Sequence, residues 1–211
     1  MVMLSTAISF DVWVIIFSVL SFIIGSIPFG RVFTKVFYNI NIYEVGSKNS
    51  GTTNVIRSTS LWLGVLTLFF DIFKVCGIVL LLKLFTYDTV SIPLWHQAFV
   101  GTVGIFGHCF SIFHKFHGGK GVASTVGLLL VIVPKLFLAI LPIWLLFIVS
   151  SRYMSLANIV SSIAIIIGSF FFLPHSIPSI QPLIILISLL VIYRHKDNIK
   201  RLISKTESKL F

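Results

Sequence analysis

The chain has 211 residues, of which 57% are hydrophobic, 14% aromatic and only 10% charged, and its mean hydropathy is +1.06. Soluble domains are roughly 25% charged, so this composition excludes an ordinary soluble protein and a disordered one, and predicts a chain that resides in the lipid bilayer. The net charge of +10 would indicate nucleic-acid binding only if the basic residues clustered on a surface that water can reach. Nucleic acid explains the charge of such an apolar chain poorly, so we expect no nucleic-acid partner.

Four apolar segments are long enough to cross about 30 Å of hydrocarbon as helices of about 20 residues. They are residues 12–29, 61–82, 94–113 and 153–173. No basic residue precedes the first segment, so we expect it to remain as an anchor rather than to be a cleaved signal sequence. A longer apolar region, 122–149, is interrupted by Pro134, and a shorter one, 182–193, precedes a basic tail.

The region 122–149 can form one long helix with a proline kink or two crossings that turn at Pro134. Residues 122–133 would span only about 18 Å as a helix, which favours the single helix. Charge placement favours two crossings, because 13 of the 16 Lys and Arg residues then lie on one side of the membrane. We therefore predict an all-α integral membrane protein with seven transmembrane helices, some of them short, the N-terminus outside and the C-terminus cytoplasmic. Without a long linker or internal repeat, residues 1–211 should form a single domain.

The first polar cluster on the predicted cytoplasmic side is GSKNSGTTN at 46–54, followed by Arg57. Two glycines with small hydroxyl and amide side chains suit a turn whose N–H groups face an oxyanion, and the guanidinium of Arg57 adds a planar fork for phosphate. The cluster therefore predicts an anion site. A solvated loop between helices explains the same residue types equally well.

The second cluster consists of Gly118, Gly119, Lys120 and Gly121, between two predicted spans. Glycines let the backbone approach a ligand closely, and the lysine ammonium supplies a point charge for phosphate. The spacing is not that of a Walker A loop, so nucleotide hydrolysis is not predicted. The alternative is a glycine turn whose lysine binds lipid headgroups.

The third cluster, residues 193–202, follows the last predicted span. His195 and Asn198 are three residues apart, so a helix along the membrane surface would display both on one face. The apolar stripe of that helix would comprise Ile192, Ile199, Leu202 and Ile203. A polybasic tail bound to anionic lipid accounts for the charges but not for His195 and Asn198.

The remaining polar residues give weaker signals. Asp71 and Lys74 lie inside a predicted span, where the pair could be functional or could neutralise each other and hold helices together. The His residues and carboxylates make no metal-ligand or acid/base pattern, so we expect no metal and no cofactor. Cys76 and Cys109 are expected to be buried thiols.

The order of these motifs resembles that of the bacterial acyl-phosphate:glycerol-3-phosphate acyltransferases, the PlsY family. The matching fragments are GSIPFG at 25–30, GSKN at 46–49 through Thr53-Asn54 and Arg57, DIFK at 71–74, GHCF at 107–110 through GGKGVA at 118–123, SRY at 151–153 with Ser155-Leu156, and Arg194-His195 with Asn198-Ile199 and Arg201-Leu202. Two positions depart from the family pattern: Val75 replaces a glycine and Ser111 replaces a proline.

The resemblance implies a seven-helix enzyme in the bacterial inner membrane, with its active site at the cytoplasmic face. It implies transfer of an acyl chain from acyl phosphate to the 1-hydroxyl of glycerol 3-phosphate, in the first acylation step of phospholipid synthesis, with no obligate protein partner beyond membrane lipids. Catalysis is then expected from Arg57, Lys120, His195 and Asn198. The substrate-binding residues are expected to be these four with Ser47, Asn49, Gly118, Gly119, Gly121 and Ser155.

A small membrane transporter of phosphate or an organic anion is the second hypothesis, since seven spans broken by glycine and flanked by basic loops would suit one. Transporters, however, tend to place polar residues and broken helices near the middle of the membrane. Here the polar clusters are predicted at one interface, which favours the enzyme.

Overall fold

The computed structural model describes residues 10–85, 92–173 and 180–210. Within these ranges the chain is helical and no strand is present, so the predicted all-α class is confirmed. The long apolar helices are α1 (Phe10–Gly25), α4 (Leu61–Phe85), α5 (Leu94–Cys109), α6 (Val122–Ile132), α7 (Pro134–Ser151), α8 (Met154–Phe172) and α9 (Gln181–Arg194). Shorter helices lie at the connections: α2 (Phe29–Tyr38), α3 (Thr52–Ser58), α10 (Lys196–Ile203) and a 3₁₀ turn, Ile112–His114.

Four helical segments of the described chain are long and apolar enough to cross a membrane. They are Asp11–Tyr38, which takes in α1 and α2, Leu61–Phe85, Pro134–Ser151 and Met154–Phe172. Large apolar side chains face outward, among them Phe69, Leu138 and the 80% exposed Phe171. Such a surface is unfavourable in water but matches the hydrocarbon of a bilayer.

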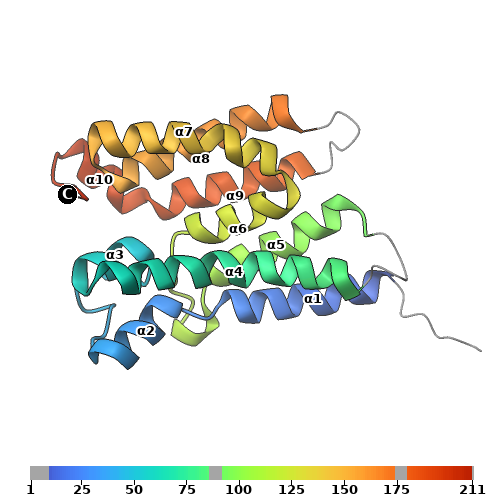
Figure 1. The fold of residues 1–211 in the computed structure, drawn as a ribbon, viewed down its shortest axis with the longest axis horizontal. Helices are drawn as coiled ribbons and strands as arrows, with labels where there is room; N and C mark the ends of the chain where they lie inside the picture. Colours follow the sequence, from blue (N-terminus) through green and yellow to red (C-terminus); the bar gives the residue numbers. More distant parts are fainter. Residues whose placement is uncertain (1–9, 86–91, 174–179, 211) are drawn as a thin grey trace, which may run out of the picture.

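The helices form two groups joined by α6 (Figure 1). α7, α8 and α9 lie together, α1, α4 and α5 lie together, and α6 packs against α4, α5 and α7. Helices α1 and α5 approach closely because glycines occupy their contact: a methyl group at Gly25 would overlap the carbonyl of Gly104. Small residues at such contacts are the usual means of packing helices in lipid, where no hydrophobic effect draws helices together.

The chain turns at Pro134, as the charge argument predicts. α6 ends at Ile132, Val133 leaves helical geometry with φ −144° and ψ 62°, and Pro134 begins α7. Proline is well placed there, because the first residue of a helix has no intrahelical use for its N–H. Figure 1 shows α7 running back in the direction opposite to α6, so the single kinked helix is wrong.

The first and third predicted segments extend too far. α1 ends at Gly25, four residues before the predicted limit, and the chain breaks before α2 begins at Phe29. The break is held by donors from other helices: Lys74 Nζ donates to the Ile27 carbonyl at 3.0 Å, and the Ser111 hydroxyl donates to the Ser26 carbonyl at 2.6 Å. α5 likewise ends at Cys109, four residues short.

These bonds show what the pair Asp71 and Lys74 does in the fold, and what Ser111 does where the family pattern has proline. Lys74 Nζ lies 2.8 Å from Asp71 Oδ1, so each charge is neutralised while the ammonium also binds the α1–α2 break. The pair thus ties α4 to α1, which accords with the structural alternative. Ser111 contributes a hydroxyl to the same break, a bond that proline could not make.

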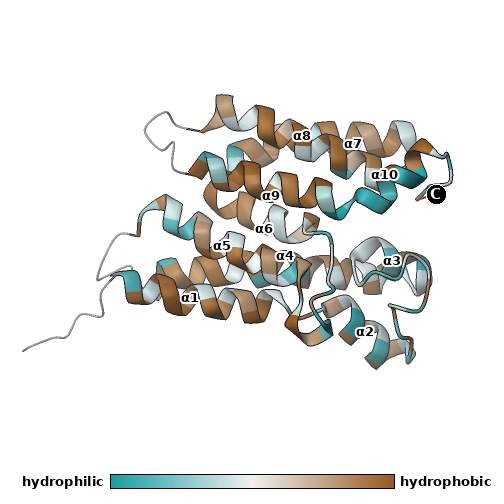
Figure 2. Ribbon diagram, turned by 180° about the vertical axis from the view of Figure 1, so that it is seen from behind, coloured by the Kyte–Doolittle hydropathy of each residue, from teal (hydrophilic) through white to brown (hydrophobic). Residues whose placement is uncertain are grey.

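Most of the hydrophilic residues gather at one end of the bundle, around α2, α3 and α10 (Figure 2). The C-terminal end of the described chain lies there, whereas α1 begins at the opposite end (Figure 1). The three polar clusters of the sequence meet at this end.

Candidate active site

The loop that precedes α3 is organised by one buried side chain, Asn54. Its Oδ1 accepts from the Ser47 N–H at 2.8 Å, and its Nδ2 donates to the carbonyls of Ile42, Val45 and Asn49. Asn54 is 2% exposed. A single amide therefore satisfies four loop groups and holds Ser47 and Asn49 at the rim of the cavity.

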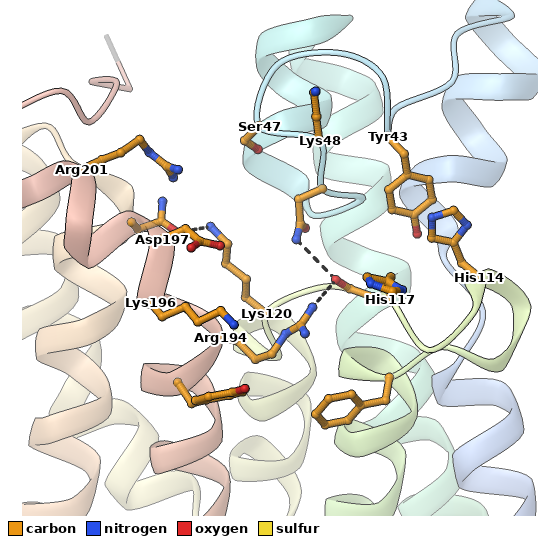
Figure 3. Close-up of a pocket in the computed structure, with 15 residues that line it drawn as sticks. Tyr43, Ser47, Lys48, His114, His117, Lys120, Arg194, Lys196, Asp197 and Arg201 are labelled. Atoms are coloured by element: carbon orange, nitrogen blue, oxygen red, sulfur yellow. Dashed lines mark hydrogen bonds between the residues drawn. The ribbon is translucent and has the colours of Figure 1, made fainter.

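The glycine loop between α5 and α6 is held from both sides (Figure 3). The Gly118 carbonyl accepts from Asn49 Nδ2 at 3.4 Å and from Arg194 at 2.7 Å, and Arg194 Nε donates to the Gly119 carbonyl at 3.1 Å. The Gly119 N–H donates to the His108 carbonyl at 2.9 Å. The Gly119 N–H is therefore used within the protein and is not free to donate to a ligand.

Gly121 ends the loop and is the N-cap residue of α6. Its φ of +88° is strained for any residue with a side chain, and no side chain caps the helix, so the first N–H groups of α6 remain available. Gly121, Val122 and Ala123 line a cavity. A helix N-terminus facing a cavity favours an anion there.

Lys120 reaches from the glycine loop to α10, as Figure 3 shows. Its Nζ donates to Asn198 Oδ1 at 2.6 Å. Burial lowers the pKa of Lys120 to about 8, with Glu207 opposing this shift and Arg201, Arg57 and Arg194 adding to it. The ammonium is therefore charged at neutral pH and loses its proton as pH rises through about 8.

His195 lies at the joint between α9 and α10 and is 1% exposed. Its Nδ1 lies 2.7 Å from the Val191 carbonyl, which can only accept, so Nδ1 carries the proton and Nε2 is the basic nitrogen. Nε2 is buried without a hydrogen-bond partner in the described chain. Burial, with the charge of Lys120, lowers the pKa of His195 to about 4, so the ring is neutral near pH 7.

The predicted surface helix needs correction. The helix breaks at His195, so Ile192 belongs to α9 while the other three residues of the predicted stripe lie in α10, and the four do not share one helix. His195 and Asn198 are buried rather than displayed, since α10 turns this face toward the bundle.

The C-terminal tail closes the site from the other side. Arg57 donates from one terminal nitrogen to the carbonyls of Ser208 and Lys209, both at 2.9 Å. The Ser155 hydroxyl donates to Glu207 Oε1 at 2.8 Å. Sequence analysis placed Asn54 in the 46–54 cluster without giving it a role of its own, and it did not name Glu207; the available signal was that Glu207 is one of only six acidic residues and lies in a basic tail.

These residues surround a cavity of about 520 Å³ with a polar and an apolar part. Nine of the ten predicted site residues line one or both of two adjoining cavities; Gly119 lines neither and lies against the His108 ring. The apolar wall of the first cavity, the one of about 520 Å³, includes Leu68, Val122 and Trp144. The second cavity, about 560 Å³, is lined by Tyr43, His114, His117 and Arg194 among others and is drawn in Figure 3.

Known proteins resemble the chain over nearly its full length. The family model described as glycerol-3-phosphate acyltransferase matches residues 15–205. A glycerol-3-phosphate acyltransferase of Fusobacterium nucleatum is 39% identical over 193 residues, covering 92% of this chain and 96% of that protein. The Bacillus subtilis glycerol-3-phosphate acyltransferase is 36% identical over 192 residues, covering 91% and 95%.

A solved structure has the same fold. The crystal structure of PlsY (YgiH), an integral membrane glycerol 3-phosphate acyltransferase, in its glycerol 3-phosphate form, superposes with a TM-score of 0.82 at 31% identity. The match covers 93% of this chain and 94% of that one. The lysophosphatidic acid form of the same protein gives a TM-score of 0.80.

Proposed function

Because the chain belongs to the glycerol-3-phosphate acyltransferase family and is thus an integral membrane acyltransferase, we propose that it moves a fatty acyl chain from an acyl phosphate to the 1-hydroxyl of sn-glycerol 3-phosphate. The products are lysophosphatidic acid and inorganic phosphate. The observation that carries the choice of donor is one cavity that joins Arg57 and Lys120 to an apolar wall at Leu68 and Trp144. Such a cavity suits a ligand with a phosphate at one end and a hydrocarbon chain at the other.

In the proposed reaction the acceptor hydroxyl oxygen attacks the acyl carbonyl carbon, and the bond from that carbon to the phosphate oxygen breaks. Phosphate leaves with the bonding electrons, so no covalent enzyme intermediate is needed. Lys120 and the N-terminus of α6 stabilise the charge on the departing phosphate, while Arg57 and Ser47 bind the second phosphate group. Asn49 and Gly118 hold the loops that carry these groups.

His195 orients the acceptor. His195 lines the cavity, and its unprotonated Nε2, which has no partner in the described chain, can accept a hydrogen bond from the hydroxyl. With a pKa of about 4, the imidazole is too weak a base to take the proton fully before the transition state. The proton therefore passes to the leaving phosphate, whose own basicity is higher.

We further propose that the single domain crosses the bacterial inner membrane seven times, with the polar end of the bundle facing the cytoplasm. Support comes from the seven apolar helices α1 and α4 to α9, and from the opposite positions of the start of α1 and the C-terminal end. The concentration of basic residues at the polar end agrees with the positive-inside tendency. The polar clusters meet at one end rather than at mid-membrane, which disfavours the transporter alternative.

The purified chain, in detergent or nanodiscs, should release phosphate only when a long-chain acyl phosphate and glycerol 3-phosphate are both supplied. By analogy with the family, acyl-CoA should give no acylated product. Phosphate release and product mass are measured together. Equal turnover with acyl-CoA would contradict acyl phosphate as the donor. Uptake of phosphate into liposomes without acylation would favour the transporter hypothesis.

Replacing Arg57 with alanine should lower kcat/KM for glycerol 3-phosphate about 10- to 100-fold, the effect of losing a charged hydrogen bond of about 1.5–3 kcal/mol. Lys135→Ala is the matched control, since Lys135 is an exposed cation at the start of α7, remote from both cavities. An Arg57→Ala enzyme with wild-type kinetics would remove Arg57 from the phosphate site.

A further inference from the structure

The carboxylate of Glu207 receives three hydrogen bonds from residues of two helices. Oε1 accepts from Asn198 Nδ2 at 2.7 Å and from the Ser155 hydroxyl at 2.8 Å, and Oε2 accepts from Arg201 Nε at 2.7 Å. The side chain is only 6% exposed. Burial alone would raise the pKa of Glu207, but the three bonds lower it, so the group is a carboxylate that can only accept.

This acceptor determines which way the Asn198 amide faces. An amide has one accepting and one donating end, and Glu207 can bind only the donating Nδ2. Oδ1 must then face the other way, where it accepts from Lys120 Nζ at 2.6 Å. Glu207, Asn198 and Lys120 thus form a chain of hydrogen bonds with a fixed direction, ending on the ammonium in the cavity.

The backbone keeps Glu207 in this place. Lys205 has φ +57°, which reverses the chain after α10, and the N–H groups of Thr206 and Glu207 donate to the Arg201 carbonyl. Farther along, the Leu210 N–H donates to the Arg152 carbonyl at 2.8 Å. The tail is therefore bound on both sides of Glu207, so the carboxylate is preorganised.

We propose that Glu207 is a positioning residue of the acyltransferase, which acts through the Asn198 amide to hold the Lys120 ammonium at the phosphate site. Glu207 does not contact the substrate in this account, and the inference rests on the proposed function. The negative charge also acts directly on the cavity. Four charged groups influence Lys120, namely Glu207, Arg201, Arg57 and Arg194, and of these only Glu207 favours its protonated form.

Glu207→Gln should lower kcat about 10-fold and shift the alkaline limb of the pH dependence of kcat/KM to lower pH. The pKa of Lys120 is about 8 in the wild-type chain, and removal of the Glu207 charge, which favours the protonated form, lowers that pKa, so activity is lost earlier as pH rises. Glu44→Gln is the matched control: Glu44 also accepts from an asparagine amide, that of Asn41, but is exposed and lines neither cavity. It should keep the wild-type rate and pH limb.

A double-mutant cycle tests the route through Asn198. In an Asn198→Ala background the further loss of kcat from Glu207→Gln, measured below the alkaline limb where Lys120 keeps its proton, should fall below 2-fold, because the amide through which Glu207 acts is already absent. Equal 10-fold losses in both backgrounds, or an unchanged alkaline limb in Glu207→Gln, would overturn the proposal. A rise in the activity of Glu207→Gln would also overturn it, because the carboxylate would then compete with the phosphate. Wild-type turnover in the same assay keeps these outcomes separate from a failure of the proposed function. If Glu207→Gln does not yield monodisperse protein, Glu207→Asp, which shortens the reach but keeps the charge, is taken through the same cycle with the same kcat criterion, and its alkaline limb should stay in place.

Discussion

Replacing Lys120 with alanine should lower kcat for acyl transfer by about 100-fold or more while the protein remains folded in the membrane. Lys120 is the ammonium that the glycine loop, α6 and Asn198 together hold inside the cavity. Loss of a preorganised group that stabilises charge in the transition state costs about 10²–10³ in rate. Stability should change little, because the removed charge is partly desolvated and its burial is unfavourable in the absence of substrate.

The control for this variant lies in the same loop. Lys115→Ala removes an equal charge five residues away, from a side chain that is exposed and absent from the walls of both cavities. It should retain wild-type turnover, and both variants should elute as monodisperse protein with similar Tm. If Lys120→Ala kept more than a tenth of wild-type kcat, the phosphate would have to be stabilised elsewhere.

Long-range hydropathy and charge made the helical framework predictable. Apolar segments fall where the helices lie, and the charge argument located the turn at Pro134 that length alone argued against. The ends of α1 and α5 could not be predicted, because they depend on donors from distant residues. The break after Gly25 is stabilised by Lys74 and Ser111, and no local pattern reveals that those side chains meet it.

The residues of the candidate site likewise fall into those that the sequence made recognisable and those that it did not. Residues with a phosphate-binding chemistry of their own, such as Arg57 and Lys120, were recognisable by type and by neighbouring glycines. Asn54 and Glu207 act by satisfying other groups of the protein, and that role depends on where the chain brings them. The burial of His195 depends likewise on the joint between α9 and α10, which places the ring inward instead of on a surface stripe.

Gly119→Ala should reduce kcat about 100-fold with only a modest fall in Tm. A methyl group at Gly119 would overlap the imidazole of His108, a ring that is 7% exposed and lies 3.6 Å from Asp71 Oδ1. Either the ring or the loop must move, and the loop carries Lys120 at the next position. A displacement of about 1 Å at a catalytic group costs about 10² in rate, whereas overpacking at one site costs about 1–3 kcal/mol of stability.

The comparison that isolates this effect is Gly77→Ala. Its new methyl group would lie at 3.4 Å from ring carbons of Phe73, an ordinary contact, and Gly77 is within α4, where alanine is the better helix former by about 1 kcal/mol. Gly77→Ala should therefore keep full turnover with an equal or higher Tm. Wild-type kcat in Gly119→Ala would mean that His108 yields without moving the loop, and the close approach of Gly119 would then serve packing alone. If the double variant with Gly119→Ala and Lys120→Ala is no less active than Lys120→Ala alone, the glycine acts by placing the lysine, because two changes that remove the same interaction are not additive.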